Sequence, residues 1–330
     1  MKPVKWGIIG PGNIARQFAN DLQHIDSPQK IEAVLGNPDS DSVKEFADEF
    51  SVPRQFTGLD EFVKNANADV VYIATPHPLH HEQAKACLEN KLPVLCEKPL
   101  TINKEQAREL IQLSKQNNTF LMEGMWIRFL PVLQKVLELV RADTIGKIIA
   151  VNGSMSYKAP YDPENRYFDP DKGGGSLLDL GVYPIFLSTL LLGKPRVIKA
   201  IGKLADTGVD ESCSVLLGYT SGAHAIIESS IIFETSKPAE IIGEKGVIQI
   251  LPPWFEESPG IDVQIYGEQK ITYHSAWPGH GLQYQVQEVL DCLANNRIES
   301  EQMPHSLSLD VVDTMDEIRN QINVSYDKYE

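Results

Sequence analysis

The sequence has few of the features that indicate a secreted or nucleic-acid-binding protein. Four of its 330 residues are cysteine, and no two of them form a Cys-x-x-Cys pair: Cys87, Cys96, Cys213 and Cys292. This usage predicts reduced thiols rather than a disulfide framework. With 30 Lys and Arg against 45 Asp and Glu, the formal net charge is −15. Such a charge argues against nucleic acid or an anionic membrane surface as the partner.

The sequence shows no signal-peptide pattern and no internal repeat, and we expect no apolar run of transmembrane length. We therefore expect a cytoplasmic protein. His77, His80 and His81 lie close together, but no acidic or cysteine partner stands near them at ligand spacing. The pattern predicts no metal site, and a metal-dependent lyase or hydrolase is disfavoured for the same reason.

A glycine-rich stretch near the N-terminus is the most informative feature that is present. An apolar, partly β-branched run at residues 4–9 leads into Gly-x-Gly-x-x-Ala. Gly10 allows a tight turn, Gly12 leaves room for a phosphate, and Asn13 and Ile14 begin a helix. The free N–H groups and positive dipole end of that helix would bind a pyrophosphate. The pattern predicts an NAD or NADP site, against the alternative of a glycine turn in another kind of α/β protein.

Strands and helices alternate as far as about residue 124. Alternation of this kind predicts a parallel sheet with right-handed crossovers and helices on both faces, here a Rossmann domain over residues 1–124. Ligands of such sheets bind at the carboxyl ends of the strands. From the strand-end loops and their neighbours, we predict cofactor contacts for Asn37, Thr75, Pro76, His80, Glu97, Lys98, Trp126 and Arg128.

The tip of the second strand, Gly36-Asn37, bears on the choice of cofactor. An acidic residue at this tip binds the ribose 2′-hydroxyl of NAD, and an arginine there binds the 2′-phosphate of NADP. This chain has neither at the tip, although Asp39 and Asp41 follow. The two aspartates slightly favour NAD, unless they simply cap the helix at residues 42–50.

Residues 125–330 follow a different pattern. Several strands are joined by turns too short for a crossover helix, as at residues 220–222 and 243–246. We expect a second α+β domain with a large, mostly antiparallel sheet. If helices cover one face of that sheet, the other face is left for an interface, and we expect a homodimer or a higher homo-oligomer.

Three polar residues are candidates for the chemistry. Lys98 ends an apolar strand, where a lysine can polarise a substrate hydroxyl near the nicotinamide. Asp179 and Tyr183 are four residues apart and share one helical face. Tyr183 would take the hydroxyl proton, Lys98 would lower the pKa of the phenol, and Asp179 would orient the lysine or a sugar hydroxyl. The alternatives are a surface lysine and a capped amphipathic helix with an exposed Asp179. Pro184 predicts a kink in that helix.

Three motifs together resemble the Gfo/Idh/MocA oxidoreductase family: Gly10-x-Gly12, Glu97-Lys98-Pro99 and Asp179-x-Gly181-x-Tyr183. Residues 122–129 and 181–184 are most similar to the branch of dimeric dihydrodiol dehydrogenase and NADP-dependent D-xylose dehydrogenase. The resemblance implies a Rossmann domain, a C-terminal domain with an open sheet that dimerises, sugar or diol substrates, and Lys98 and Tyr183 as the catalytic pair. Many members have histidine in place of Tyr183, and NADP-using members commonly have Ser-Arg where this chain has Gly36-Asn37.

The sequence therefore predicts an NAD(P)-dependent oxidoreductase. The substrate would be a secondary alcohol, or the corresponding carbonyl, of a sugar, a polyol or a trans-diol. A dinucleotide-bound sensor or regulatory protein is the alternative, and the presence of Lys98, Asp179 and Tyr183 counts against it, because a regulator has no need of a proton-transfer set.

Overall fold

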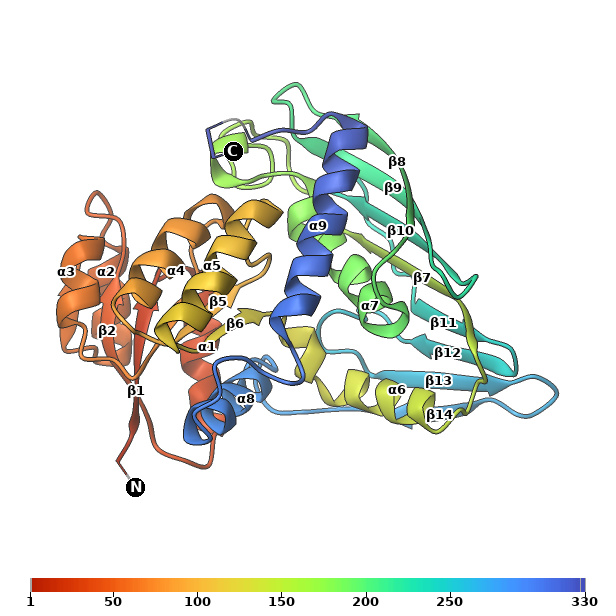
Figure 1. The fold of residues 1–330 in the computed structure, drawn as a ribbon, viewed down its shortest axis with the longest axis horizontal. Coiled ribbons are helices and arrows are strands. Elements are labelled where there is room, and N and C mark those ends of the chain that lie inside the picture. Colours follow the sequence, from red (N-terminus) through yellow and green to blue (C-terminus); the bar gives the residue numbers. More distant parts are fainter. Residues whose placement is uncertain (1, 327, 330) are drawn as a thin grey trace. The chain divides into compact units, whose positions relative to one another are not determined.

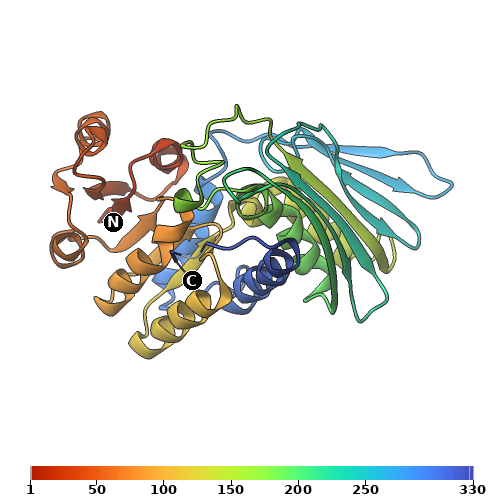
Figure 2. The same ribbon diagram turned by 90° about the horizontal axis from the view of Figure 1, so that it is seen from above.

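The computed structural model describes residues 2–326 and 328–329. Packing divides this part of the chain into two compact units (Figures 1 and 2). The first contains the residues up to Trp126 together with Pro278–Ser308, and the second contains Ile127–Trp277 together with the residues from Leu309 onward. All four cysteines are free and buried.

The division differs from the predicted consecutive domains, because the chain returns to the first unit over residues 278–308. A carboxylate far away in the sequence fixes the return: Asp21 accepts hydrogen bonds from the backbone N–H groups of His280 (2.9 Å) and Leu282 (2.8 Å). The backbone N–H of Leu121 donates to the carbonyl of Ile298 at 3.0 Å. No local sequence pattern predicts these contacts.

The first unit contains the predicted parallel sheet, in the order β3-β2-β1-β4-β5-β6. Strands β4, β5 and β6 are buried along their whole length, as expected for parallel strands covered on both faces, whereas β3 at the edge is mostly exposed. β3 has only three residues, too few for a recognisable sequence pattern. The strands are β1 Val4–Ile9, β2 Gln29–Leu35, β3 Arg54–Phe56, β4 Val70–Ile73, β5 Val94–Glu97 and β6 Leu121–Gly124.

Helices cover both faces of this sheet, as right-handed crossovers require. The rings of Trp6, Phe18 and Tyr72 pack where α1 meets the sheet, with centroid distances of 5.0 Å and 4.0 Å between neighbours. The elements are α1 Asn13–Asp21, η1 Leu22–His24, α2 Ser42–Phe50, α3 Leu59–Asn65, η2 His77–Leu79, α4 His80–Glu89, α5 Lys104–Asn117 and α8 Gln283–Ala294.

The second unit is built on an eight-stranded sheet in the order β14-β13-β12-β11-β7-β10-β9-β8. β7 and β10 are parallel and the other neighbours are antiparallel, as predicted. The strands are β7 Ile148–Ser156, β8 Val197–Leu204, β9 Asp210–Gly218, β10 His224–Ser230, β11 Ala239–Gly243, β12 Gly246–Ile250, β13 Gly260–Ile265 and β14 Ile271–His274.

Helices cover one face of this sheet (Figures 1 and 2). On that face Gly153 of β7 makes room for Pro184, since a Cβ at Gly153 would lie 2.7 Å from the proline Cβ. Gln321 bonds to the backbone of β8 at Ala200 and Ile198. The elements are η3 Trp126–Phe129, α6 Pro131–Arg141, η4 Pro170–Lys172, η5 Leu177–Gly181, α7 Val182–Leu192 and α9 His305–Ile322.

One helical stretch, Pro170–Leu192, is long and apolar enough to cross a membrane by length and composition. This finding differs from the prediction that no apolar run reaches transmembrane length. Its most apolar window is 83% buried inside the structure. Within this stretch α7 packs against the sheet, where Pro184 contacts Gly153 of β7. Packing in a protein core accounts for this composition.

Candidate active site

Gly10 forms the turn between β1 and α1. Its φ is +89°, and a Cβ there would lie 2.7 Å from Thr75 Cγ2 and 2.9 Å from the carbonyl oxygen of Ala74. The backbone N–H of Gly12 donates to the carbonyl of Gly10 at 2.8 Å and closes the turn. Only glycine combines this conformation with so close an approach.

The start of α1 has the properties of a phosphate site. Gly12 is the N-cap residue, and among the described residues no side chain caps the helix there. A Cβ on Gly12 would meet no described atom within 4 Å, so this side of the turn is open. Uncapped N–H groups at Asn13 and Ile14, beside an open backbone, fit the pyrophosphate of a dinucleotide.

The tip of β2 is held by packing and by a local turn. A Cβ at Gly36 would lie 2.7 Å from Val43 Cγ2 and 2.9 Å from Pro11 Cδ, so glycine lets the phosphate loop and α2 pack closely. Asn37 Oδ1 accepts a hydrogen bond from the N–H of Asp39 at 3.0 Å. Asp41 precedes α2 but makes no side-chain cap bond, which disfavours a simple capping role.

His80 lies beneath the neighbouring loops rather than at their surface. It is fully buried, and its ring nitrogens face the carbonyls of Pro99 and Thr75, each at 2.9 Å. Burial lowers the pKa of the His80 imidazole. The two carbonyls favour the protonated ring and oppose this decrease only in part. His80 thus joins the loop after β4 to the loop after β5. Thr75 Oγ1 also donates to Gln83 Oε1 at 2.6 Å.

Lys98 is a buried lysine, only 9% exposed, so the alternative of a surface lysine is wrong. Two buried carboxylates hold its loop. Glu97 accepts hydrogen bonds from the Tyr72 hydroxyl (2.6 Å) and the backbone N–H of Lys98 (3.2 Å), and Glu123 accepts one from the N–H of Leu100 (3.0 Å). Burial raises the pKa of both carboxyl groups, and the positive charge of Lys98 opposes that rise. The positive charge of the Lys98 ammonium group is therefore complementary to these two carboxyl groups.

Asp179 and Tyr183 in the second unit are also buried, with 8% and 6% exposed, which excludes the predicted alternative of an exposed Asp179. Asp179 lies in a π-helical turn, η5, and Tyr183 in the first turn of α7. The π turn ends at Gly181, and Pro184 lies in the first turn of α7, where a proline is tolerated; the kink at Pro184 stays a prediction. The ring of Phe255 lies beside that of Tyr183, with 6.3 Å between centroids.

Arg166 is a neighbour of Asp179 that the sequence analysis missed. Its Nη2 lies 2.8 Å from Asp179 Oδ1. The negative charge of Asp179 is the largest cause of a raised pKa of the Arg166 guanidinium. Burial opposes this rise, and Tyr167 and Tyr183 make smaller contributions that raise the pKa further. Arg166 lies thirteen residues before Asp179 in an irregular loop, where no helical or strand spacing links the two.

The start of η5 is fixed by a carboxylate from another element. Asp210 Oδ2, at the beginning of β9, accepts hydrogen bonds from the hydroxyl of Ser176 (2.6 Å) and the N–H of Leu177 (2.8 Å). Ser176 is the N-cap residue of η5, but its side chain makes no cap bond there. A Cβ at Gly175, whose φ is +114°, would lie 2.4 Å from Asp210 Oδ1. Asp210 is thus the anchor of the segment that carries Asp179 and Tyr183.

The replacement Asp210→Asn should remove a pH-dependent part of the stability. Burial raises the pKa of Asp210 from 3.8 to about 6. Between these values the folded state holds a proton that the unfolded state has released, so stability falls as pH rises through this window. The loss is about 3 kcal/mol by pH 7. Urea unfolding is measured at pH 3 and pH 7. The free energy of unfolding of wild type should change more between these pH values than that of the variant, by about 3 kcal/mol. An equal pH dependence in both proteins would contradict the assignment.

The predicted residues Trp126 and Arg128 lie shortly after the end of β6, and Trp254 is a buried aromatic residue of the second unit. Arg128 is buried, its guanidinium carbon lies 6.0 Å from the centre of the Phe129 ring, and its carbonyl accepts a hydrogen bond from Gln134 at 2.7 Å. Trp126 begins η3. Trp254 is 3% exposed and donates to the carbonyl of Ser154 at 2.9 Å. Within the described residues, no three His, Cys, Asp or Glu side chains form a group that could hold a metal ion.

Comparison with known families decides what this scaffold is. Residues 4–125 match a model of the oxidoreductase family with an NAD-binding Rossmann fold, and residues 133–249 match a model of the GFO/IDH/MocA C-terminal domain. The chain belongs to the Gfo/Idh/MocA oxidoreductase family. It is therefore an NAD(P)-binding oxidoreductase, as the three sequence motifs predicted.

Relatives within this family match over nearly the whole chain. Trans-1,2-dihydrobenzene-1,2-diol dehydrogenase from Xenopus laevis is 33% identical, with 98% of this chain and 99% of that protein covered. The enzyme of the same name from Mus musculus is 31% identical, with 98% of each chain covered. The family assignment thus extends to both units.

Solved structures share the fold at lower identity. Aldose-aldose oxidoreductase from Caulobacter crescentus, complexed with glycerol, has a TM-score of 0.86 at 22% identity, with 98% of each chain covered. Levoglucosan dehydrogenase, solved with NADH and L-sorbose, has a TM-score of 0.87 at 18% identity, covering 98% of this chain and 97% of that one. A 3-ketoreductase from Actinomadura kijaniata, solved with NADP and TDP-benzene, has a TM-score of 0.84 at 22% identity, covering 97% and 98%.

Proposed function

We propose that this enzyme transfers hydride between nicotinamide C4 and a secondary alcohol, or the corresponding carbonyl, of a sugar, polyol or trans-diol. The observation that carries the proposal is the burial of three polar side chains. Lys98, Asp179 and Tyr183 are each less than a tenth exposed. Burying charged and polar groups costs free energy unless they are paired, and groups of this kind concentrate at functional sites.

The proposed roles follow from the chemistry of each group. When bound, the nicotinamide supplies or accepts the hydride. Tyr183 holds the proton of the reacting substrate oxygen and takes it up or returns it as the carbon changes oxidation state. Lys98 hydrogen-bonds to the same oxygen and stabilises its negative charge. Asp179 orients a neighbouring hydroxyl or the lysine.

The phosphate site is assigned to Gly10, Gly12, Asn13 and Ile14, where the uncapped start of α1 fits a pyrophosphate. Asn37 follows β2, and Thr75 and Pro76 follow β4; these two strands flank β1 in the sheet. We assign Glu97 and His80 an indirect role, because both are buried and contact the backbone of the loops after β4 and β5. Glu97 accepts from the N–H of Lys98, and the His80 ring nitrogens face the carbonyls of Thr75 and Pro99. We assign Trp126 and Arg128 to the nicotinamide end of the site.

We infer a preference for NAD over NADP. The tip of β2 carries Asn37 and is followed by Asp39 and Asp41, so a 2′-phosphate would meet carboxylates. Arg16 of α1 is paired with Glu45 and Glu49 of α2. A phosphate placed among these acidic groups would be repelled, whereas a 2′-hydroxyl would be tolerated.

Titration with NADH and NADPH, followed by nicotinamide fluorescence, tests both inferences. We expect NADH to bind at least about tenfold more tightly, a difference of about 1.4 kcal/mol. The matched control is Gly12→Asp, whose side chain enters open space and leaves stability unchanged but places a carboxylate where the pyrophosphate binds. Tighter binding of NADPH would overturn the preference. Binding of neither nucleotide would overturn the proposed function.

The substrate class is tested by turnover. Relatives named for trans-1,2-dihydrobenzene-1,2-diol and solved structures named for aldoses and levoglucosan suggest a cyclic substrate with neighbouring hydroxyl groups. A screen of NAD⁺ reduction with trans-dihydrodiols, D-xylose, D-glucose and inositols should find turnover among these compounds. Nucleotide binding without turnover of any of them would favour a dinucleotide-bound sensor.

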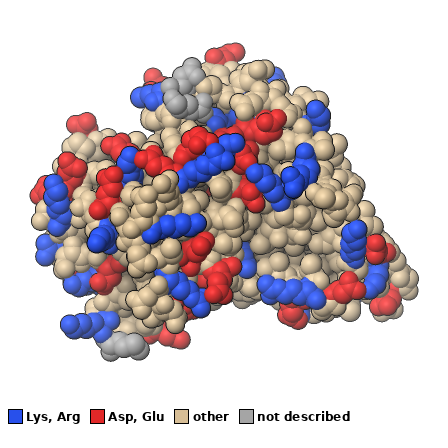
Figure 3. Space-filling model, viewed as in Figure 1, with Lys and Arg blue, Asp and Glu red and all other residues tan. Residues whose placement is uncertain are grey.

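We also propose a homodimer formed by the uncovered face of the second unit's sheet. Apolar side chains on β8, β9 and β10 are exposed there, with Ile201 80%, Ile226 53% and Leu216 48% exposed. Leu216 and Ile226 are register partners on neighbouring strands and therefore form one patch. The molecular face seen in Figure 1 is drawn again in Figure 3, where Lys and Arg side chains are interspersed with Asp and Glu.

The double variant Ile201→Glu/Ile226→Glu should be monomeric, because two carboxylates in a self-complementary patch meet their own copies. Light scattering across a concentration series measures the mass. Leu79→Glu, at an apolar residue of the first unit that is 36% exposed, serves as the control and should keep the wild-type mass. A monomeric wild type, or a double variant with the wild-type mass, would contradict the proposed interface.

A further inference from the structure

The loop between β7 and η5 brings Arg166 to Asp179. The guanidinium Nη2 lies 2.8 Å from the carboxylate, and the Arg166 side chain is 59% exposed against 12% for that of Asp179. Ion pairs between two exposed side chains contribute little. This pair differs, because the carboxylate is almost fully buried and loses most of its hydration, so the arginine supplies a needed partner.

Local hydrogen bonds shape the backbone on both sides of Arg166. Asn165 Oδ1 accepts from the N–H groups of Tyr167 (2.8 Å) and Phe168 (3.2 Å), and its amide donates to the carbonyl of Pro160 (3.0 Å). The guanidinium carbon of Arg166 lies 5.0 Å from the centre of the Tyr167 ring. These contacts restrict the direction of the arginine side chain and reduce the entropy lost when it pairs with Asp179.

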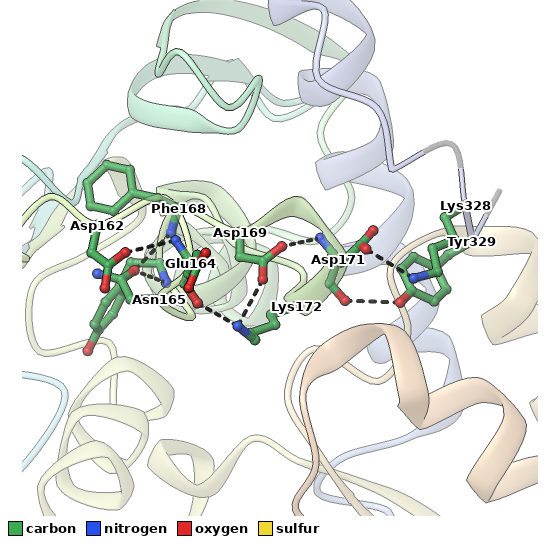
Figure 4. A network of polar contacts seen from close by, with 10 residues as sticks. Asp162, Glu164, Asn165, Phe168, Asp169, Asp171, Lys172, Lys328 and Tyr329 are labelled. Carbon is green, nitrogen blue, oxygen red and sulfur yellow. Dashed lines mark hydrogen bonds and ion pairs between the residues drawn. The ribbon is translucent and has the colours of Figure 1, made fainter.

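Residues near the C-terminus hold the other end of the same loop (Figure 4). Lys328 Nζ lies 3.0 Å from Asp171 Oδ2, and the Tyr329 hydroxyl donates to the carbonyl of Asp171 at 3.0 Å. The buried hydroxyl of Tyr326 donates to the carbonyl of Gly174 at 2.5 Å. The loop is therefore tied to the second unit at several points.

We propose that Arg166 is a positioning residue for the proton transfer: it fixes the carboxylate of Asp179 and places a positive charge near the phenol of Tyr183. This inference rests on the proposed role of Tyr183 as the proton carrier. Asp179 and Tyr183 both contribute to the electrostatic environment of the guanidinium, so its charge acts on both in return. A cation in this place favours the phenolate over the phenol.

The central test compares Arg166→Gln with Arg166→Lys. Arg166→Gln should lower kcat ten- to a hundredfold and move the acid limb of the kcat–pH profile to higher pH by about one unit, because the phenolate loses its cation. Arg166→Lys keeps the positive charge but loses the planar guanidinium group and its hydrogen-bond geometry. The acid limb should therefore stay at its wild-type pH, while kcat lies between those of Arg166→Gln and wild type. Lys158→Gln is the matched control, since it removes one charge from an exposed residue of the same loop.

The dissociation constant for NADH should change less than threefold in these variants, which separates positioning from nucleotide binding. Thermal unfolding is measured for each variant, and Arg166→Lys keeps the test valid if Arg166→Gln unfolds. Wild-type kcat and an unmoved acid limb in Arg166→Gln would overturn the proposal. So would an equal shift of the limb in Lys158→Gln.

A second readout does not need turnover. Tyrosine labelled with ¹³C at Cζ reports ionisation by NMR, and the signal that disappears in Tyr183→Phe is assigned to Tyr183. In Arg166→Gln this signal should titrate at higher pH than in wild type, by the same amount as the limb. A shift seen in a protein that oxidises no substrate would uphold the electrostatic role of Arg166 and refute the proposed reaction. Equal titration in both proteins would refute the role of Arg166.

Discussion

Replacement of Lys98 by alanine is expected to lower kcat by about 10³-fold or more while the dissociation constant for NADH changes less than threefold. The ammonium group stabilises charge on the substrate oxygen, and alanine cannot replace it. The backbone contact that holds the loop persists, because Glu97 accepts from the N–H of residue 98 rather than from its side chain. His80 still joins this loop to the one after β4.

The same variant leaves two buried carboxylates without the cation that opposes their protonation. The pKa values of Glu97 and Glu123 are raised by burial and lowered by the charge of Lys98, so they should rise further in Lys98→Ala. Both groups then bind protons in the folded state at higher pH. Lys98→Met serves as the control, because it keeps the packing of the side-chain stem and removes the charge.

The measurements are steady-state kinetics with the best substrate from the turnover screen and fluorescence titration with NADH. Lys98→Ala and Lys98→Met should lose kcat equally if charge is the cause. Normal turnover in either variant would refute the assignment of Lys98. Lost nucleotide binding in Lys98→Met would show that the lysine acts on the cofactor instead.

Replacement of Tyr183 by phenylalanine is expected to lower kcat by about 10² to 10⁴-fold, the usual contribution of a positioned acid or base. The ring stays in place beside Phe255, and the helix beneath the sheet keeps its packing, so stability should change little. The variant loses the hydroxyl alone. Its kcat–pH profile should lose the limb that reports ionisation of the phenol.

The kcat–pH profile of Tyr183→Phe, compared with wild type over about pH 5 to 10, checks this prediction. An unchanged limb would exclude Tyr183 as the proton carrier. Because Lys98 and Tyr183 are assigned to one substrate oxygen, the double variant should lose less than the product of the two single effects. Multiplicative losses would indicate that the two residues act independently.

Much of the scaffold follows from short-range patterns in the sequence. The run β1–Gly10–α1 combines an apolar strand, a glycine with positive φ and a helix start within a few residues, and all three features are local. The sequence predicts Lys98 at the end of β5, because an apolar strand precedes it and a proline follows it. The mostly antiparallel second sheet followed from short turns. Turns and periodicities depend on neighbouring residues, so one sequence is sufficient to read them.

The tertiary structure decided features that depend on residues far apart in the chain. The return of residues 278–308 to the first unit depends on Asp21, some 260 positions earlier. β3 has too few residues to show a period.

In the site, the sequence by itself determined that Asp179 and Tyr183 share a helical segment and that Lys98 ends a strand. Only the tertiary structure revealed that Asp210 anchors that segment, that Arg166 pairs with Asp179, and that His80 is buried under two loops. Spacing along a helix or strand is set by local backbone geometry, which depends only on neighbouring residues. The partner of a buried charge is set by which distant segments meet when the chain folds, and no local pattern encodes that meeting.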